Sequence, residues 1–99
     1  MISRQWTGIA PKEKALIYIA HLQNDTFPKL SSIKGFIKAS ILKRNVPEGV
    51  EFLVVTEWES LEAIKQFAGI DPGVAVVPAE VQEIMIRYDK TVKHYEIAG

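Results

Sequence analysis

The side chain best suited to chemistry in this sequence is the imidazole of His94, the only histidine expected on a strand. An imidazole titrates near neutral pH, so it can take a proton from a phenol and start the oxidation of an electron-rich ring. The alternative is a structural histidine, hydrogen-bonded near the edge of a dimer. The second histidine, His21, falls on an expected helix beside Tyr18 and Leu22, from which it could reach the same cleft. A partly exposed helix position is the simpler interpretation.

Two tryptophans lie where a flat ligand could bind. Trp58 ends an apolar strand shortly before a helix. Its ring can stack on an aromatic ligand or plug the open end of the core, and the sequence favours neither. Trp6 has the same alternatives, with core packing favoured. We predict a small-ligand pocket between helices and sheet, lined by Trp6, Trp58, Phe67 and also by Tyr18 and His94.

Arg4 is expected on the same strand face as Trp6, because alternate residues of a strand share a face. A guanidinium in that position can hold an anionic group of a substrate. A salt bridge to a neighbouring glutamate is the simpler account, and we expect it. Tyr18 and Tyr95 can each donate a phenolic O–H in a pocket, although amphipathic core positions explain both equally well.

Four strands and two main helices are expected to position these side chains. The strands are predicted at residues 2–9, 36–44, 50–58 and 91–97, and the helices at residues 11–25, 60–68 and, as a short extra element, 79–86. Pro28 is expected to end the regular part of the first helix. Ser60 can cap the second helix, and Gly69 can end it. This order predicts an α+β, ferredoxin-like βαββαβ fold with a four-stranded antiparallel sheet.

The turn at residues 46–49 sets the pairing of the two central strands. Proline and glycine there suit the second and fourth positions of a tight turn. If Pro47 forms the centre of the turn with Glu48, Lys38 faces Glu57, and Arg44 faces Glu51. Opposite charges directly across two strands stabilise the pairing modestly. A basic stretch of the chain is thereby neutralised by an acidic one, so we expect no nucleic-acid site.

Both faces of the expected sheet are apolar at their centres. Alternation places Ile37, Ala39, Ile41, Phe52, Val54 and Trp58 on one face, and Ser40, Leu42, Leu53 and Val55 on the other. One layer of helices covers only one of these faces. We therefore predict a homodimer in which Leu42, Leu53 and Val55 turn toward a second copy.

Length and composition limit the class of protein. Ninety-nine residues suit a single domain spanning 1–99, and twelve basic residues balance twelve acidic ones, which favours neither nucleic acid nor an anionic membrane. The absence of cysteine excludes disulfides and thiolate nucleophiles and fits a cytoplasmic protein. No phosphate loop, dinucleotide fingerprint, catalytic triad or compact metal-ligand spacing is visible, so we expect no cofactor and no metal.

Four segments carry a resemblance to a known family: Trp6-Thr7-Gly8, Gly35-Phe36, residues 58–64 with Phe67, and His94-Tyr95-Glu96. With them the chain resembles the antibiotic-biosynthesis-monooxygenase-like family of the dimeric α/β-barrel superfamily. The resemblance covers nearly the whole chain and implies ferredoxin-like protomers that pair as a dimeric α/β barrel. Members of the family include cofactor-independent quinone-forming oxygenases, haem-degrading enzymes and small domains without assigned chemistry.

The haem-degrading branch of that family uses a strand-one asparagine, a tryptophan at the end of strand three and an iron-binding histidine on helix two. Trp58 matches the tryptophan, but residues 2–9 contain no asparagine and residues 60–68 no histidine. Haem degradation by that mechanism is therefore not expected here.

Two classes of function stay open at this point. The resemblance implies a cofactor-independent monooxygenase-like enzyme acting on a small aromatic, phenolic or quinone compound, with His94 assisting proton removal. The alternative is a domain without turnover that binds a small hydrophobic ligand or serves as a dimeric interaction module. A polar proton acceptor in the pocket would favour the enzyme, and a wholly apolar lining would favour the binding domain.

Overall fold

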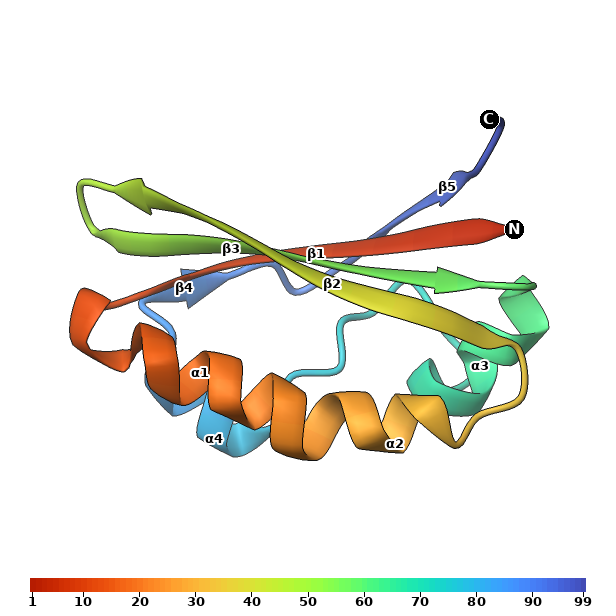
Figure 1. The fold of residues 1–99 in the computed structure, drawn as a ribbon, viewed down its shortest axis with the longest axis horizontal. Coiled ribbons are helices and arrows are strands. Elements are labelled where there is room, and N and C mark those ends of the chain that lie inside the picture. Colours follow the sequence, from red (N-terminus) through yellow and green to blue (C-terminus); the bar gives the residue numbers. More distant parts are fainter.

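One layer of helices covers one face of an antiparallel sheet in the computed structural model, which describes residues 1–99 (Figure 1). The strands are β1 (Ile2–Ala10), β2 (Phe36–Val46), β3 (Gly49–Trp58), β4 (Arg87–Tyr88) and β5 (Lys93–Glu96). The helical elements are the 3₁₀ turn η1 (Lys12–Lys14), α1 (Ala15–His21), the π-helical turn η2 (Leu22–Thr26), α2 (Phe27–Ser31), α3 (Leu61–Ala68) and α4 (Ala79–Ile84).

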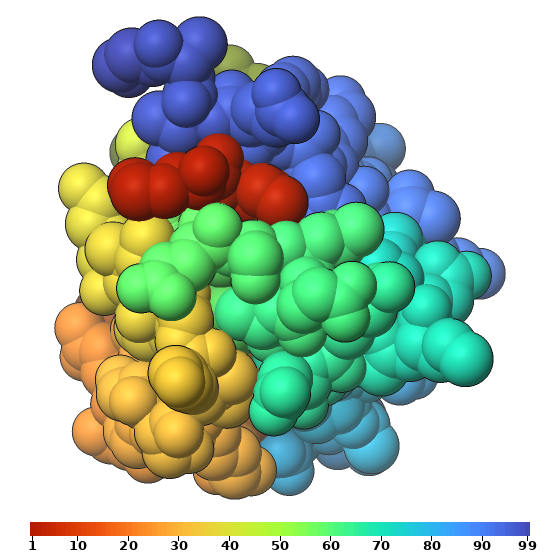
Figure 2. Space-filling view, turned by 90° about the vertical axis from the view of Figure 1, so that its right-hand side faces the viewer, coloured from red at the N-terminus to blue at the C-terminus, as the bar shows by residue number.

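The strand order in the sheet is β2-β3-β1-β4, and β5 also pairs with β1. Figure 2 shows this order at one end of the sheet, where the N-terminal residues (red) lie between β3 (green) and the C-terminal segment (blue). The order confirms the predicted ferredoxin-like α+β fold. The sheet has five strands rather than the expected four, because Arg87 and Tyr88 pair with Ile9 and Gly8. Two residues are too few to show a strand periodicity in the sequence.

The β2–β3 hairpin has the predicted register. Lys38 lies opposite Glu57, and Arg44 lies opposite Glu51. Their side chains meet as ion pairs, with nitrogen–oxygen distances of 3.2 Å for Lys38–Glu57 and 2.7 Å for Arg44–Glu51. The turn residues and the cross-strand charge pairs were therefore sufficient to predict the register of this hairpin.

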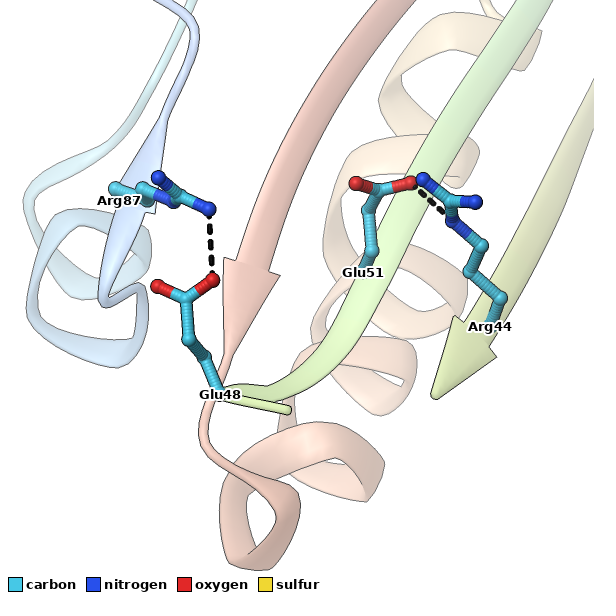
Figure 3. A network of polar contacts seen from close by, with 4 residues as sticks. All are labelled: Arg44, Glu48, Glu51 and Arg87. Atoms are coloured by element: carbon cyan, nitrogen blue, oxygen red, sulfur yellow. Dashed lines mark hydrogen bonds and ion pairs between the residues drawn. The ribbon is translucent and has the colours of Figure 1, made fainter. Parts of the chain in front are cut away.

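A third ion pair, at the turn end of the hairpin, ties the turn to β4 (Figure 3). Arg87 donates to Glu48 at 2.7 Å, close to the Arg44–Glu51 pair. The hydrogen bond from Arg44 holds the pKa of Glu51 below its ordinary value, and it raises the pKa of Arg44. All four charges are thus paired at this end of the sheet.

A β-bulge at the start of β2 changes one predicted face. Phe36 pairs with Trp58, while Lys38 pairs with Glu57, so Ile37 is the extra residue. A bulge interrupts the alternation of side chains along a strand. It places Phe36, rather than the predicted Ile37, against Trp58, with a distance of 5.2 Å between the ring centroids. Ile37 is 40% exposed instead.

The first helical segment is longer than predicted and continues through Pro28 (Figure 1). The π-helical turn η2 follows α1 directly, and Pro28 then lies in the first turn of α2. The π-helical turn directly before Pro28 already departs from the regular i→i−4 hydrogen bonding, because the N–H of Phe27 donates to the carbonyl oxygen of Leu22. The missing N–H of Pro28 therefore follows an existing irregularity of the helix. No helix in the structure has both the length and the apolar composition needed to span a bilayer.

Two buried clusters fill the space between the helices and the sheet. The larger lies under α1 and α4 and consists of Ala10, Ala15, Tyr18, Leu22, Val50, Phe52, Val81 and Met85. The smaller consists of Leu30, Trp58, Ala63 and Ile64, and it joins α2, α3 and the end of β3. The opposite face of the sheet carries no helix, and there Leu42 is 50% exposed while Leu53 and Val55 are half-buried.

Candidate functional site

A cavity of about 80 Å³ lies between the helices and the sheet. Most of its lining is apolar, and it is formed by β1, β3, the first helical segment, α3, α4 and the segment that precedes α4. The lining residues are Arg4, Trp6, Tyr18, His21, Leu22, Thr26, Phe27, Leu30, Val54, Thr56, Phe67, Val76, Val77, Pro78, Val81 and Val92. Arg4, Trp6, Tyr18 and Phe67 of the predicted pocket thus come together, whereas Trp58 and His94 are not in the lining.

Arg4 is buried in the wall of this cavity without an acidic partner. Its side chain projects from β1 and donates to the carbonyl oxygens of Pro72 and Val74, the latter at 3.2 Å. Its guanidinium also lies 5.9 Å from the centre of the Phe67 ring. None of the ion pairs in the structure includes Arg4, so the expected salt bridge to a glutamate is wrong. Glu57, next to the residue that faces Arg4 across the sheet, pairs with Lys38 of β2 instead.

The electrostatic state of Arg4 favours binding of an anion. The residue is only 5% exposed. Burial lowers its pKa to about 10, so the guanidinium remains charged at neutral pH. Buried charges in proteins are usually paired, because removing a charge from water without a partner is costly. An anionic group in the cavity would supply the missing acidic partner. Carboxylates and phenolates suit this role, because the guanidinium presents its donors as a planar fork.

His94 contacts Arg4 rather than the cavity. Its Nε2 lies 3.0 Å from Nη1 of Arg4. A guanidinium can only donate, so this Nε2 accepts and the imidazole is neutral. Burial, with a smaller contribution from the charge of Arg4, lowers the pKa of His94. Its role as a proton acceptor for substrate stays a prediction, while the geometry favours a role in positioning Arg4.

Trp58 belongs to the smaller core cluster. It is fully buried, and its Nε1 donates to Oγ1 of Thr56 at 2.9 Å. Its ring packs against Phe36 and stacks on Phe67 at 6.3 Å between centroids. Of the two interpretations left open by the sequence, the structure favours packing of the core. Trp58 supports the cavity indirectly, because it backs the Phe67 ring that lines it.

Trp6 and Tyr18 form an aromatic wall of the cavity. The rings lie 6.2 Å apart, and Nε1 of Trp6 donates to the carbonyl oxygen of Asp89 at 2.7 Å. Gly8 makes room for the Trp6 ring, because a Cβ at that position would lie 2.6 Å from its Cη2 atom. Burial raises the pKa of Tyr18, so its phenol stays protonated and can donate a hydrogen bond.

His21 at the end of α1 also lines the cavity. The predicted partly exposed position is confirmed, because 13% of the side chain is accessible, and the ring also reaches the cavity. Its Nε2 is buried without a hydrogen-bond partner. The spacing of three residues from Tyr18 was a usable signal, since such residues share a helix face. The apolar cavity residues from the segment before α4 gave no signal, because that segment has no periodicity.

No protein-family model and no curated protein matches the sequence. Among solved structures, a candidate antibiotic biosynthesis monooxygenase from Bacillus cereus superposes with a TM-score of 0.69 at 21% identity, covering 100% of this chain and 93% of that one. The heme-degrader MhuD from Mycobacterium tuberculosis, with two hemes bound in its active site, gives 0.66 at 17% identity, covering 99% and 96%.

A third similar structure is the monooxygenase from the ActVA-Orf6 gene of Streptomyces coelicolor, in complex with the ligand Nanaomycin D. It superposes with a TM-score of 0.66 at 15% identity and covers 99% of this chain and 88% of that one. These likenesses confirm the predicted fold and, at the level of fold, the predicted resemblance to antibiotic-biosynthesis-monooxygenase-like proteins. A shared fold does not fix the chemistry, which depends on the residues of the site.

Proposed function

We propose that the cavity binds a small, flat, anionic aromatic compound, and that the protein acts on it as a cofactor-independent monooxygenase-like enzyme. The observation that carries the proposal is the buried guanidinium of Arg4, which lines an aromatic cavity and has no acidic partner. Phenolates and hydroxyquinones combine an anionic oxygen with a flat ring. The folds of the monooxygenases from Bacillus cereus and Streptomyces coelicolor add support.

The proposed chemistry needs no external reductant. Arg4 stabilises the phenolate form, which loses electrons more readily than the phenol does. The phenolate then gives four electrons in total to O₂. One oxygen atom forms the new quinone carbonyl at a ring C–H carbon, and the other leaves as water with the hydrogen of that carbon and one proton from the solvent. The cavity of about 80 Å³ suits a single-ring compound better than a polycyclic one, because pockets for drug-sized ligands usually enclose about 300–1,000 Å³.

A second candidate function is binding without turnover. The observation that favours it is the contact of His94 with Arg4, which leaves this predicted base outside the cavity lining. In this reading, the cavity holds a small hydrophobic ligand and nothing removes a proton. A cytoplasmic location belongs to both proposals and is based on the absence of cysteine.

Oxygen uptake distinguishes the two candidates. The purified protein is mixed with a panel of single-ring phenols, hydroquinones and their methyl ethers, without added cofactor or metal. The enzyme is expected to consume one O₂ per phenol oxidised and to ignore the ethers, which cannot form the phenolate. Binding of the phenols without oxygen uptake would support the second function, and no binding of any compound would contradict both.

We also propose that the protein forms a homodimer through the sheet face that lacks helices. Leu53→Asp places a charge at the centre of that face, where a partner would bury it without a counter-ion. The variant is expected to be monomeric by light scattering, while the wild type has twice the chain mass. Ile70→Asp is the matched control, because Ile70 is 97% exposed and follows α3, which lies on the other side of the sheet (Figure 1). A monomeric wild type at micromolar concentration would refute the proposal.

A further inference from the structure

Three potential metal ligands meet beside the cavity. His21 lies at the end of α1, Asp25 lies in η2, and Glu80 lies in the first turn of α4. One ligand atom from each residue falls within 4.8 Å of the other two. Donor atoms around a tetrahedral Zn²⁺, bound at about 2.0–2.2 Å, are separated by roughly 3.5 Å. Closing that difference requires the carboxylates of Asp25 and Glu80, which are both accessible to solvent, to rotate toward the imidazole.

The buried Nε2 of His21 is an independent indication of a ligand. It is the one side-chain nitrogen or oxygen atom of the structure that is buried without any hydrogen bond. Its nearest carboxylate oxygen is Oδ2 of Asp25 at 3.9 Å, which is too far for a hydrogen bond. Buried polar atoms are nearly always paired, because an unsatisfied one costs free energy. A metal ion between the imidazole and the carboxylates would satisfy this atom.

The local backbone is consistent with a built site. His21 precedes the π-helical turn, and Asp25 lies within it. Single π-helical turns are rare and occur frequently at functional sites. This turn follows α1 without a break, although the sequence predicted a regular helix there.

The charge of the cluster also favours a cation. Two carboxylates against one imidazole give the three ligands a net negative charge. The one competing cation is Lys29, whose Nζ lies 3.1 Å from Oδ1 of Asp25. The Lys29 side chain is 72% exposed, and exposed ion pairs of this kind contribute little free energy. An arriving metal ion can therefore displace Lys29 at small cost.

From this cluster we propose that His21, Asp25 and Glu80 form a binding site for a divalent transition metal, with Zn²⁺ the best match. One imidazole and two carboxylates leave an open position for water, as in three-ligand zinc sites. Mg²⁺ and Ca²⁺ fit poorly, because they require six or more oxygen ligands. The ion would join η2 to the short helix α4 and so hold two walls of the cavity together. The site does not depend on the proposed enzymatic activity.

Calorimetric titration with Zn²⁺ tests the proposal directly. One Zn²⁺ ion is expected to bind per chain. Mg²⁺ at the same concentration is expected not to bind. At a free Zn²⁺ concentration about a hundred times the Kd, the melting temperature should rise by about 10 °C or more. Glu80→Gln and Asp25→Asn should each weaken binding at least about 10-fold, since even residues behind metal ligands are worth 10–100-fold.

The matched variants make the result specific. Glu83→Gln on the same helix and His94→Gln at the other histidine should leave the affinity for Zn²⁺ unchanged. Lys29→Gln removes the competing cation, so it should strengthen binding. Absence of Zn²⁺ binding overturns the proposal. Binding that survives both Glu80→Gln and Asp25→Asn, or that is lost in His94→Gln, would also overturn it, because the ion would then be held elsewhere.

Discussion

Replacing Trp58 with alanine is expected to lower the melting temperature by more than about 10 °C. The side chain is fully buried and packs between Phe36 and Phe67. Truncating a buried tryptophan to alanine costs about 3–5 kcal/mol, because it removes apolar burial and leaves a cavity. In a domain of this size, about 1 kcal/mol corresponds to roughly 4–8 °C. Thermal unfolding followed by circular dichroism measures the change.

Trp58→Phe is the matched control for that experiment. Phenylalanine keeps most of the apolar contact but loses the hydrogen bond to Oγ1 of Thr56. We expect this variant to lose only a few degrees, in line with the value of about 1 kcal/mol for one hydrogen bond. A Trp58→Ala protein that melts at the wild-type temperature would contradict the conclusion that Trp58 stabilises the core. Stacking on a ligand would then be the better interpretation of this residue.

The parts of the fold that the sequence predicted well are those set by local chemistry. The turn at Pro47 and Glu48 fixed the register of the hairpin, and the charge pairs across it agreed. The bulge at Ile37 was not predictable, because it depends on how the Phe36 ring packs against Trp58 after folding. The pairing of β4 with Gly8 and Ile9 was likewise set by a contact distant in sequence.

The candidate site likewise combines residues that local sequence patterns predict with contacts between residues distant in sequence. Strand alternation placed Arg4 beside Trp6, and both line the cavity as predicted. The partners of Arg4 could not be read from the sequence, because two of them are backbone carbonyl oxygens of the Pro72–Val74 segment. The third, His94, reaches Arg4 because β5 pairs with β1 in a register that puts the two residues opposite one another. A histidine interpreted as a base therefore turns out to contact the anion-binding candidate.

Replacing Arg4 with methionine is expected to weaken binding of a phenolate by about 10–100-fold. A hydrogen bond to a charged group contributes about 1.5–3 kcal/mol, and each 1.4 kcal/mol is a factor of ten in affinity. Methionine fills the space of the arginine stem, so the aromatic wall keeps its shape. Trp58→Phe is a useful background, because Trp6 is then the only tryptophan and its fluorescence reports on the cavity.

The probe for this measurement is para-nitrophenol, and its methyl ether is the matched neutral ligand. In mildly alkaline buffer the phenol is ionised, and we expect the wild-type cavity to bind it more tightly than the ether. Arg4→Met should remove that preference and leave the affinity for the ether unchanged, whereas Arg4→Lys should keep part of it. His94→Gln should preserve most of the preference, because the glutamine oxygen can still accept from Arg4. Equal binding of phenolate and ether by the wild type would show that Arg4 does not recognise an anion, and the proposed substrate class would then be wrong.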